Sequence, residues 1–239
     1  MDFKILDEND VNSYITYPAN LTCYPESSVD ANHEFHDSHF PNPVPDKIRL
    51  SKQSIISSSF VDEAEQTSKF IKKILPKLNT ITDATANVGC NTLNFSKHFS
   101  HVNAVELDPL EYDRLENNIK LYKLKNVNVY NQDYTKILDN LTQDVVFIDA
   151  PQGGKKHFLL EKFIQCLSKI RIENIANYIL NHRLARLVVL KVPRNIWLSD
   201  LKYAYKRVDI YRNLSHLSSL IFISDERLNK TENKIILHD

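Results

Sequence analysis

The sequence predicts an α/β fold with a doubly wound, mostly parallel sheet, and three observations lead to this prediction. Short apolar segments alternate with amphipathic ones from residue 80 onward. Two of the apolar segments, Asp144–Asp149 (DVVFID) and Leu187–Val192 (LVVLKV), are almost continuously hydrophobic, which is typical of parallel strands covered on both faces. Polar residues and glycines stand where such segments end, at the edge where doubly wound sheets bind ligands.

The composition is that of a globular intracellular protein. The chain has 239 residues, 42% of them hydrophobic, which is enough for one domain with a good-sized core and an arm. No apolar run approaches the roughly 20 residues that span a bilayer, and the acidic N-terminus lacks the apolar stretch of a signal peptide. The three cysteines lie far apart, which favours a reducing compartment and argues against disulfides or a zinc cluster.

Residues 1–46 are expected to form an acidic, Pro-rich arm. Five of the nine prolines lie in this segment, together with nine acidic residues and one basic residue. Prolines at this density prevent long helices and disfavour central strands. His33, His36 and His39 are spaced so that they could meet on a metal ion, but the Pro-rich context argues against such a site and no metal is expected.

Residues 47–80 are expected to form a helical segment that leads into the core domain, residues 81–239. Its helix is predicted at Asp62–Leu75, because apolar residues recur there with helical spacing and Pro76 follows. The strands are predicted at Thr80–Thr85, Val102–Glu106, Val127–Tyr130, Asp144–Asp149, Leu187–Val192, Arg207–Leu214 and Leu217–Ser224, the last two as a closing hairpin. The helices between them are predicted at Asn91–Phe99, Leu110–Leu121, Tyr134–Asn140, within His157–Asn181, and at Ile196–Tyr205.

The first turn from strand to helix, Asp83–Thr92, has the features of a ligand-binding turn. Gly89 allows the chain to turn tightly and to approach a ligand closely, and the following helix offers free backbone amides. Asp83 stands at the end of the strand. A single glycine is weak evidence by itself, and an ordinary turn is the alternative.

Acidic residues follow the next two strands. Glu106 ends the second strand, where a carboxylate can accept hydrogen bonds from two ribose hydroxyls. Asp108, which precedes Pro109, is better explained as the N-cap of the next helix. Asp133 follows the third strand, where it could accept a hydrogen bond from the exocyclic amine of an adenine or cap a helix.

The fourth strand ends in the segment DAPQGG, residues 149–154. A polar side chain, a rigid proline and two glycines there place acceptors at the ligand edge of the sheet, where they can hold an exocyclic amino group near a methyl donor. Methyl transfer from a sulfonium needs alignment more than a strong base. The alternative is a plain strand exit, which the order of four such strand ends disfavours.

These segments resemble, in order, those of the RNA cap guanine-2-amino methyltransferases, the trimethylguanosine synthase family. The resemblance implies a Rossmann-like class I methyltransferase fold with seven strands, S-adenosylmethionine as the cofactor and capped RNA as the substrate. It also implies that the segment DKIRLSKQSIISSSFVDEAEQ, which precedes the core, lies near cofactor and cap. The matching segments are TDATANVGCNTLNF, VNAVELDP, LENNIKLY, NQD, DVVFIDAPQGG, KVPRNIWLSDL and LSSLIFIS, within about Lys47 to Ser224.

The resemblance implies three groups of site residues. The expected cofactor-binding residues are Asp83, Thr85, Ala86, Gly89, Asn91, Thr92, Glu106, Leu107, Asp133 and Asp149. The expected catalytic residues, which would position the amine, are Asp149 and Pro151. The expected substrate-binding residues are Gln152, Lys155, Lys191, Arg194 and Trp197, with Lys156 as a further phosphate contact.

The chain departs from the family pattern in two places. The glycine-rich turn keeps one glycine, with Asn87 and Cys90 where small, permissive residues are usual. At the fourth strand exit, Ala150 replaces a proline and Gln152 replaces the tryptophan that stacks on the methylated guanine. Such stacking contributes about 1–3 kcal/mol per base, which Gln152 cannot supply. Trp197 could substitute for it, or could be a buried helix aromatic.

A basic C-terminal half favours an RNA partner, although the whole chain has no net charge. Residues 155–212 have thirteen basic and four acidic residues, a pattern typical of proteins that bind polyanions. Two other functions stay open: a degenerate relative that binds RNA or a protein without catalysis, and a methyltransferase for another exocyclic amine in nucleic acid. Abundant Asn, Lys and Ile are typical of AT-rich genomes, such as those of large viruses, which act inside a host cell, or of protists.

Overall fold

A computed structural model describes residues 35–152, 164–193, 195–196, 207–211, 218–224 and 234–238. These residues belong to two compact units. The first unit contains the described residues up to Asp144, and the second contains those from Val145 onward. Each unit has its own strands and its own buried core.

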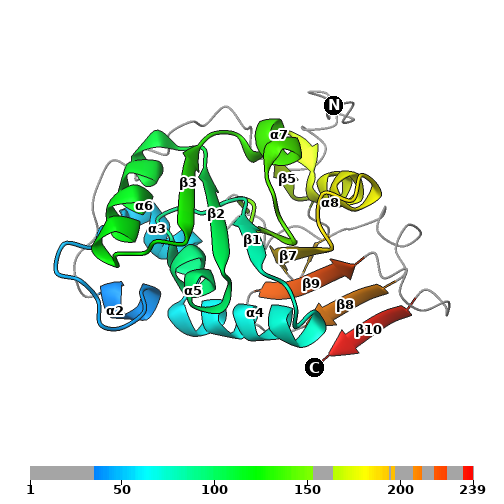
Figure 1. Cartoon of the computed structure of the whole chain (residues 1–239), viewed down its shortest axis with the longest axis horizontal. Helices are drawn as coiled ribbons and strands as arrows, with labels where there is room; N and C mark the ends of the chain where they lie inside the picture. Colours follow the sequence, from blue (N-terminus) through cyan, green and yellow to red (C-terminus); the bar gives the residue numbers. More distant parts are fainter. Residues whose placement is uncertain are drawn as a thin grey trace. The chain divides into compact units, whose positions relative to one another are not determined.

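Three parallel strands form the sheet of the first unit. The strands β1 (Thr80–Asp83), β2 (His101–Glu106) and β3 (Val127–Asn131) lie side by side in that order (Figure 1). Because the strands are parallel, their carboxyl ends meet at one edge, and Glu106 pairs there with Asn131. The helices of this unit are α2 (His36–His39), α3 (Lys52–Ser57), α4 (Val61–Ile74), α5 (Cys90–His98), α6 (Pro109–Leu121) and α7 (Tyr134–Ile137), and the 3-10 helix η3 spans Leu138–Asn140.

The helix ends agree with the signals in the sequence. The helix α4 begins at Val61, carries Asp62 in its first turn and ends before Pro76, which confirms the predicted helix. At α6 the Asp108 carboxylate accepts a hydrogen bond from the Leu110 backbone N–H at 2.8 Å, which confirms the predicted N-cap.

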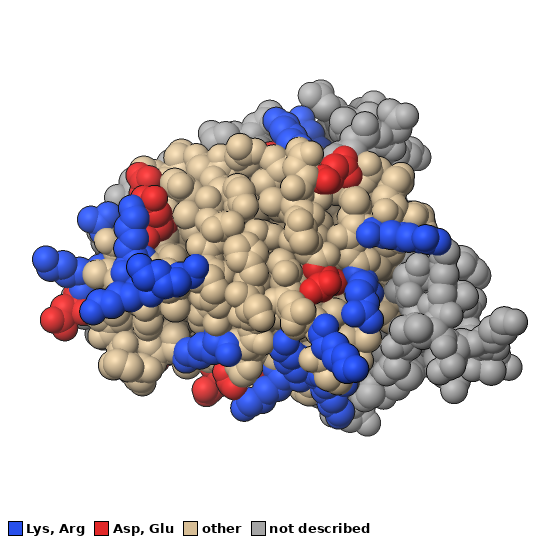
Figure 2. All heavy atoms as spheres, in the orientation of Figure 1, with Lys and Arg blue, Asp and Glu red and all other residues tan. Residues whose placement is uncertain are grey.

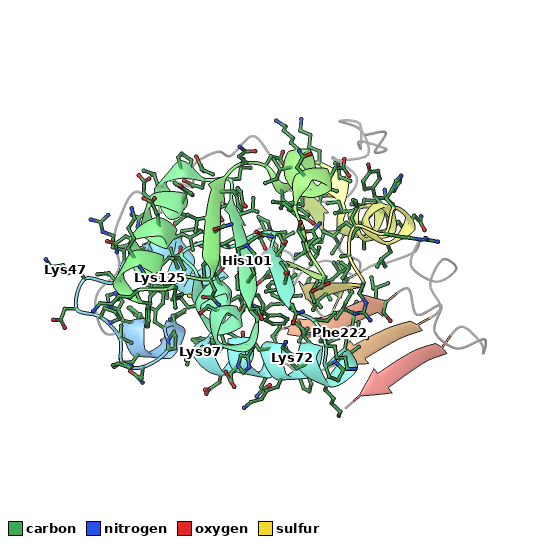
Figure 3. All side chains as sticks on the ribbon, viewed as in Figure 1. Lys47, Lys72, Lys97, His101, Lys125 and Phe222 are labelled. Atoms are coloured by element: carbon green, nitrogen blue, oxygen red, sulfur yellow. The ribbon has the colours of Figure 1, made fainter. Side chains whose placement is uncertain are left out.

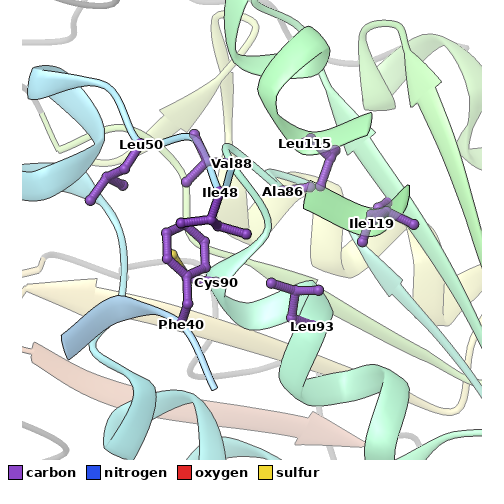
Figure 4. Close-up of a cluster of buried hydrophobic side chains, with 10 residues drawn as sticks. Phe40, Ile48, Leu50, Ala86, Val88, Cys90, Leu93, Leu115 and Ile119 are labelled. Carbon is purple, nitrogen blue, oxygen red and sulfur yellow. The ribbon is translucent and has the colours of Figure 1, made fainter. Parts of the chain in front are cut away.

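The hydrophobic core of the first unit joins the segment before α4 to the β1–α5 turn (Figure 4). Phe40 has no exposed surface and packs in this cluster, although it belongs to the expected arm. Full burial of one such side chain contributes about 1.5–3 kcal/mol. The buried members of the cluster are Phe40, Ile48, Leu50, Ala86, Val88, Cys90, Leu93, Ala104, Leu115 and Ile119.

Among the described residues of the second unit, five strands lie side by side in the order β10-β8-β9-β7-β4, and two further strands, β5 and β6, pair with each other. Of these strands, β4 and β7 are parallel neighbours, β9 runs antiparallel to both β7 and β8, and β10 runs parallel to β8. The β8–β9 pair is the predicted closing hairpin. The elements are β4 (Val145–Ile148), β5 (Cys166–Leu167), β6 (Ile170–Arg171), α8 (Ile172–Asn181), β7 (Leu187–Pro193), β8 (Arg207–Tyr211), β9 (Ser218–Ser224) and β10 (Lys234–His238).

Three details of the predicted fold were wrong. The expected count of seven strands omitted β10, a short apolar segment after the predicted hairpin. Residues 166–171 were expected to be helical but form the two-stranded hairpin β5–β6. Ser168 and Lys169 have φ angles of 50° and 64° there, which a helix does not allow. The last residues of the helix predicted at Tyr134–Asn140 form the separate 3-10 helix η3.

Most of the helix predicted at Ile196–Tyr205 lies outside the described residues. In the part of the chain that the structure describes, no helix has the length and apolar character needed to cross a membrane.

Candidate active site

The turn after β1 is held from inside the protein. The Asp83 side chain is fully buried, and its Oδ2 accepts a hydrogen bond from the Thr92 hydroxyl in α5 at 2.7 Å. Ala86 is also buried, and its backbone N–H donates to the Val105 carbonyl at 2.9 Å. Asp83, Thr92 and Ala86 therefore fix the geometry of the turn, while Thr85 between them is partly exposed.

Gly89 occupies a position that only glycine fits without strain. Its φ angle is 101°, in the left-handed region, and it directly precedes α5. A Cβ atom on this residue would lie 2.9 Å from a methyl carbon of Leu115, closer than real contacts allow. The close packing brings the backbone amides at the start of α5 to the turn, where they can meet a ligand.

Asn87 takes over the role of a missing glycine in the same turn. Its φ angle of 51° is also left-handed, a conformation that Asn tolerates better than most residues. Two serines hold its side chain: the Ser54 hydroxyl donates to Oδ1 at 2.7 Å, and Nδ2 donates to the Ser57 hydroxyl oxygen at 3.0 Å. The segment before the core thus contacts the turn directly.

A third serine of that segment holds the first turn of α5. The Asn91 Nδ2 donates to the Ser59 hydroxyl oxygen at 3.0 Å, and both side chains are buried. The Asn91 Oδ1 is buried as well and has no hydrogen-bond partner among the described residues. Our sequence reasoning missed these serine contacts; the serine run at residues 57–59 was the available signal.

Glu106 ends β2 beside the turn. Its Oε2 accepts a hydrogen bond from the Asn87 backbone N–H at 2.7 Å, and its Oε1 accepts one from the Asp108 N–H at 2.8 Å. The pKa of the Glu106 carboxyl is raised to about 7: burial is the main cause, the two backbone hydrogen bonds oppose the rise, and the nearby carboxylates of Glu111 and Asp108 contribute to it.

Glu111 is a second acid with a raised pKa in this region. Burial raises the pKa of its carboxyl, and a hydrogen bond from Ser51 and the positive charge of Arg114 counteract that effect. The Ser51 hydroxyl donates to Glu111 Oε1 at 2.6 Å, and the Arg114 Nη1 lies 3.7 Å from Oε2. Glu111 therefore connects α6 to the serine segment, and Glu106 is the acid at the end of the strand.

Leu107 and Asp133 lie on the same side of the first unit's sheet, after β2 and β3. Leu107 is 40% exposed, which is unusual for a large apolar side chain and leaves it available to a ligand. Asn131 fixes its backbone by donating to the Glu106 and Leu107 carbonyls at 2.9 and 3.2 Å. Asp133 caps α7, because its Oδ1 accepts hydrogen bonds from the backbone N–H and the hydroxyl of Thr135.

The exit of β4 in the second unit carries the expected catalytic residues. The Asp149 Oδ2 accepts a hydrogen bond from the Lys191 Nζ on β7 at 3.0 Å, and both side chains are largely buried. The Ala150 carbonyl accepts a hydrogen bond from the Nε2 of Gln165. Pro151 is exposed and Gln152 is half-buried. Lys191, expected at an RNA phosphate, has Asp149 as its partner instead.

Several expected site residues lie outside the described residues: Gly153, Gly154, Lys155, Lys156, Arg194 and Trp197. His36 and His39 are described and buried, and the Nδ1 and Nε2 of His39 lie 2.9 and 3.2 Å from the backbone carbonyl oxygens of Phe35 and Ile55. Within the described ranges, no group of three or more His, Cys, Asp or Glu side chains could hold a metal ion.

Basic side chains of the first unit gather along the edge that carries α4 (Figure 2). Lys72 and Lys97 lie on this edge (Figure 3). Lys72 also has a structural role, because its Nζ donates to the Leu78 carbonyl at 2.6 Å and lies 4.2 Å from the centre of the Phe99 ring. Of the thirteen basic residues at positions 155–212 that suggested RNA, eight lie outside the described residues or have no described side chain.

The first unit offers groups of the kinds that the adenosine and methionine parts of S-adenosylmethionine need. Glu106 offers a carboxylate for ribose hydroxyls, and Leu107 offers an exposed apolar side chain for a base. Asn91 has a carbonyl oxygen without a partner among the described residues, and an ammonium group could donate to it. Groups that could contact S-adenosylmethionine thus lie around the β1–α5 turn.

A parallel α/β sheet with this turn, this acid and the antiparallel strand β9 between β7 and β8 is typical of the Rossmann-like methyltransferases. The chain belongs to the family of RNA cap guanine-N2 methyltransferases, whose model matches residues 78–233. This finding confirms the resemblance seen in the sequence, and with it S-adenosylmethionine as the cofactor of the family.

One similar curated protein is an uncharacterized protein of Acanthamoeba polyphaga mimivirus, 39% identical over 134 residues. The alignment covers 55% of this chain and 51% of that protein, so the chain spans about half of its relative's length.

Solved structures with a similar fold include three proteins with low sequence identity. A putative methyltransferase from Porphyromonas gingivalis W83 has a TM-score of 0.55 and 16% identity, with 77% of this chain and 45% of that chain covered. A human methyltransferase 10 domain containing protein has a TM-score of 0.53 and 12% identity, with 68% and 81% covered. A T. thermophilus 16S rRNA N2 guanine methyltransferase, in complex with AdoMet and guanosine, has a TM-score of 0.51 and 14% identity, with 68% and 43% covered. These likenesses confirm the fold class.

Proposed function

We propose that this protein transfers a methyl group from S-adenosylmethionine to the 2-amino group of a 7-methylguanosine RNA cap. One observation carries the proposal: the Glu106 carboxylate at the end of β2 accepts a hydrogen bond from the backbone of the β1–α5 turn at Asn87, 2.7 Å away. A ribose acceptor and an amide-rich turn thereby form one site. Family membership supports the choice of the guanine amine.

The first unit would bind the cofactor through its own residues. Glu106 would accept hydrogen bonds from the ribose hydroxyls, and Leu107 would contact the adenine. Gly89 permits the close approach of the turn, since its backbone leaves no room for a Cβ atom. Asp83 and Thr92, which are buried and bonded to each other, would position the turn.

The β4 exit would hold the amine. Bound S-adenosylmethionine supplies an electrophilic methyl group, so the protein must mainly align the nucleophile. The carboxylate of Asp149 would accept a hydrogen bond from the amine, and Pro151 would restrict the backbone beside it. Gln152 would line the substrate side without an aromatic stack.

Capped RNA is the partner that we propose for this site, and the interior of a host cell is the proposed location. The relative in a mimivirus supports a viral source, in which a cap-modifying enzyme would act on transcripts within the infected cell. The expected phosphate contacts, Lys155, Lys156 and Arg194, together with Trp197 at the cap, remain predictions.

Methyl transfer from labelled S-adenosylmethionine tests the proposal. The acceptors are the same short RNA with a 7-methylguanosine cap, with an unmethylated guanosine cap, and with a 5′-triphosphate, and digestion identifies the modified nucleoside. We expect label in N2-methylated 7-methylguanosine from the first RNA alone. Asp149→Asn should lower the rate of transfer strongly while leaving it measurable, whereas Lys120→Met, at an exposed site on α6, should keep the full rate.

The two alternative functions predict different results in these assays. Label in an internal base of all three RNAs would support an amino methyltransferase with another substrate. Calorimetry with S-adenosylhomocysteine would identify a degenerate relative, because such a protein would show no binding at high micromolar concentration.

A further inference from the structure

The register of two strands places a lysine beside the expected catalytic acid. In the parallel pair β4–β7, Ile148 lies opposite Leu190. The residues that follow, Asp149 and Lys191, therefore stand next to each other at the carboxyl end of β4. Their side chains complete the contact, with 3.0 Å between the Lys191 Nζ and the Asp149 Oδ2.

This ion pair is buried in a strongly apolar setting. The Lys191 side chain is 8% exposed and that of Asp149 is 11% exposed. The four preceding residues of β7, Leu187–Leu190, have no exposed surface. Moving two charges out of water costs several kcal/mol per ion, and an apolar pair of similar volume is often as stable or more stable. Stability alone therefore does not account for a lysine at this position.

A second buried side chain holds the next residue of the same exit. Gln165 is fully buried, and its Nε2 donates to the Ala150 carbonyl. Two consecutive residues of the β4 exit are thus fixed by polar side chains from elsewhere in the second unit: the Asp149 carboxylate by Lys191, and the Ala150 peptide by Gln165. Such support is what a catalytic group needs to stay in one orientation.

We propose that Lys191 is a positioning residue, which holds the Asp149 carboxylate in place as the acceptor for the substrate amine. The inference rests on the proposed function, and it assigns Lys191 to the acid rather than to an RNA phosphate. In the transfer, the amine nitrogen forms a bond to the methyl carbon, and the bond from that carbon to sulfur breaks with its electron pair left on sulfur. The proton lost by nitrogen passes to Asp149 and then to water, while Lys191 keeps its own protons.

Steady-state kinetics of four variants test the inference. Lys191→Met should lower kcat by on the order of 100-fold, the scale of losing one fixed electrostatic contact in a reaction centre, with KM for the capped RNA within about twofold of wild type. Lys191→Arg keeps the positive charge and should recover part of kcat. The double variant Asp149→Asn/Lys191→Met should be no slower than Asp149→Asn, because Lys191 acts only through Asp149. Arg186→Met, at an exposed site before β7, is the matched control with unchanged kcat.

Each outcome of these measurements supports or overturns the role of Lys191 as a positioning residue. If Lys191→Met has an unchanged kcat, a raised KM for RNA and a smaller salt dependence of binding, Lys191 contacts an RNA phosphate. That result would overturn the inference. Additive losses in the double variant would also overturn it. If Lys191→Met does not fold, as thermal unfolding would show, Lys191→Arg and the double variant carry the test.

The same assays separate this inference from the proposed function. A wild-type protein that methylates a different amine would contradict the cap substrate, while the kinetic pattern of the variants would still test Lys191. A wild-type protein that methylates no acceptor would overturn both.

Discussion

Replacement of Glu106 by glutamine tests whether this acid binds the cofactor ribose. Burial raises the pKa of Glu106 from 4.5 to about 7. The folded protein therefore keeps a proton on Glu106 between these pH values, whereas the unfolded chain has lost it. Since the folded state binds more protons in this pH range, the free energy of unfolding falls as pH rises from 4.5 to 7. Above pH 7 the contribution of Glu106 no longer changes. A shift of this size corresponds to at most about 3 kcal/mol, because partial exposure of Glu106 reduces it.

Cofactor binding should follow the opposite trend. Ribose hydroxyls donate hydrogen bonds, so they favour the ionised carboxylate, and binding should release a proton near neutral pH. With a pKa of about 7, the Kd for S-adenosylhomocysteine should fall about tenfold between pH 6 and pH 8. Glu106→Gln should raise the Kd at pH 8 by about 10- to 100-fold, since a hydrogen bond to a charged group contributes about 1.5–3 kcal/mol.

Titration calorimetry in buffers of different ionisation enthalpy measures both the Kd and the released proton. Urea unfolding at the same pH values measures stability. The variant should lose the pH dependence of binding and the part of the stability profile due to Glu106, while Glu116→Gln, at an exposed site on α6, should keep both. A wild-type Kd that tightens as pH falls, or identical pH profiles for wild type and Glu106→Gln, would refute the reasoning.

Three substitutions in the first unit should destabilise the protein, with urea unfolding as the measurement. Gly89→Ala forces a Cβ atom into a left-handed backbone 2.9 Å from Leu115, which should cost about 1–3 kcal/mol and weaken S-adenosylhomocysteine binding; unchanged values would contradict the strain. Thr92→Val removes the hydroxyl that donates to buried Asp83 and should cost about 1–3 kcal/mol, whereas Thr92→Ser should cost less; equal losses would point to packing instead. Phe40→Ala should cost about 3–5 kcal/mol because the ring is fully buried, and a loss below 1 kcal/mol would show that the segment before α4 is not part of the core.

Local signals in the sequence predicted the parts of the fold that short-range physics determines. The Asp108-Pro109 pair has one good use, to start a helix, and α6 starts there. Short continuous apolar runs rich in valine likewise predicted β4 and β7, since such runs are typical of strands buried on both faces. The positions of Gly89 in the turn before α5 and of Glu106 at the end of β2 followed from the same pattern.

Contacts that depend on tertiary packing could not be predicted in this way. The β5–β6 hairpin turns at Ser168 and Lys169, residues with no preference for left-handed backbone, so their sequence resembles a helix. Lys191 was expected at an RNA phosphate, and only the register with β4 places it beside Asp149. In both places the structure depends on residues that are distant in the sequence, and a single sequence does not show which residues come into contact.

The reduced glycine content of the turn is explained by the same kind of long-range contact. Left-handed Asn87 costs up to about 1 kcal/mol more than glycine, but each of its two side-chain hydrogen bonds to Ser54 and Ser57 returns about 0.5–1.5 kcal/mol. Asparagine also loses less backbone entropy on folding than glycine does. Because the Asn87 backbone N–H donates to Glu106 as well, one residue connects α3, the turn and the end of β2. A fixed asparagine therefore replaces a flexible glycine and positions the expected ribose acceptor.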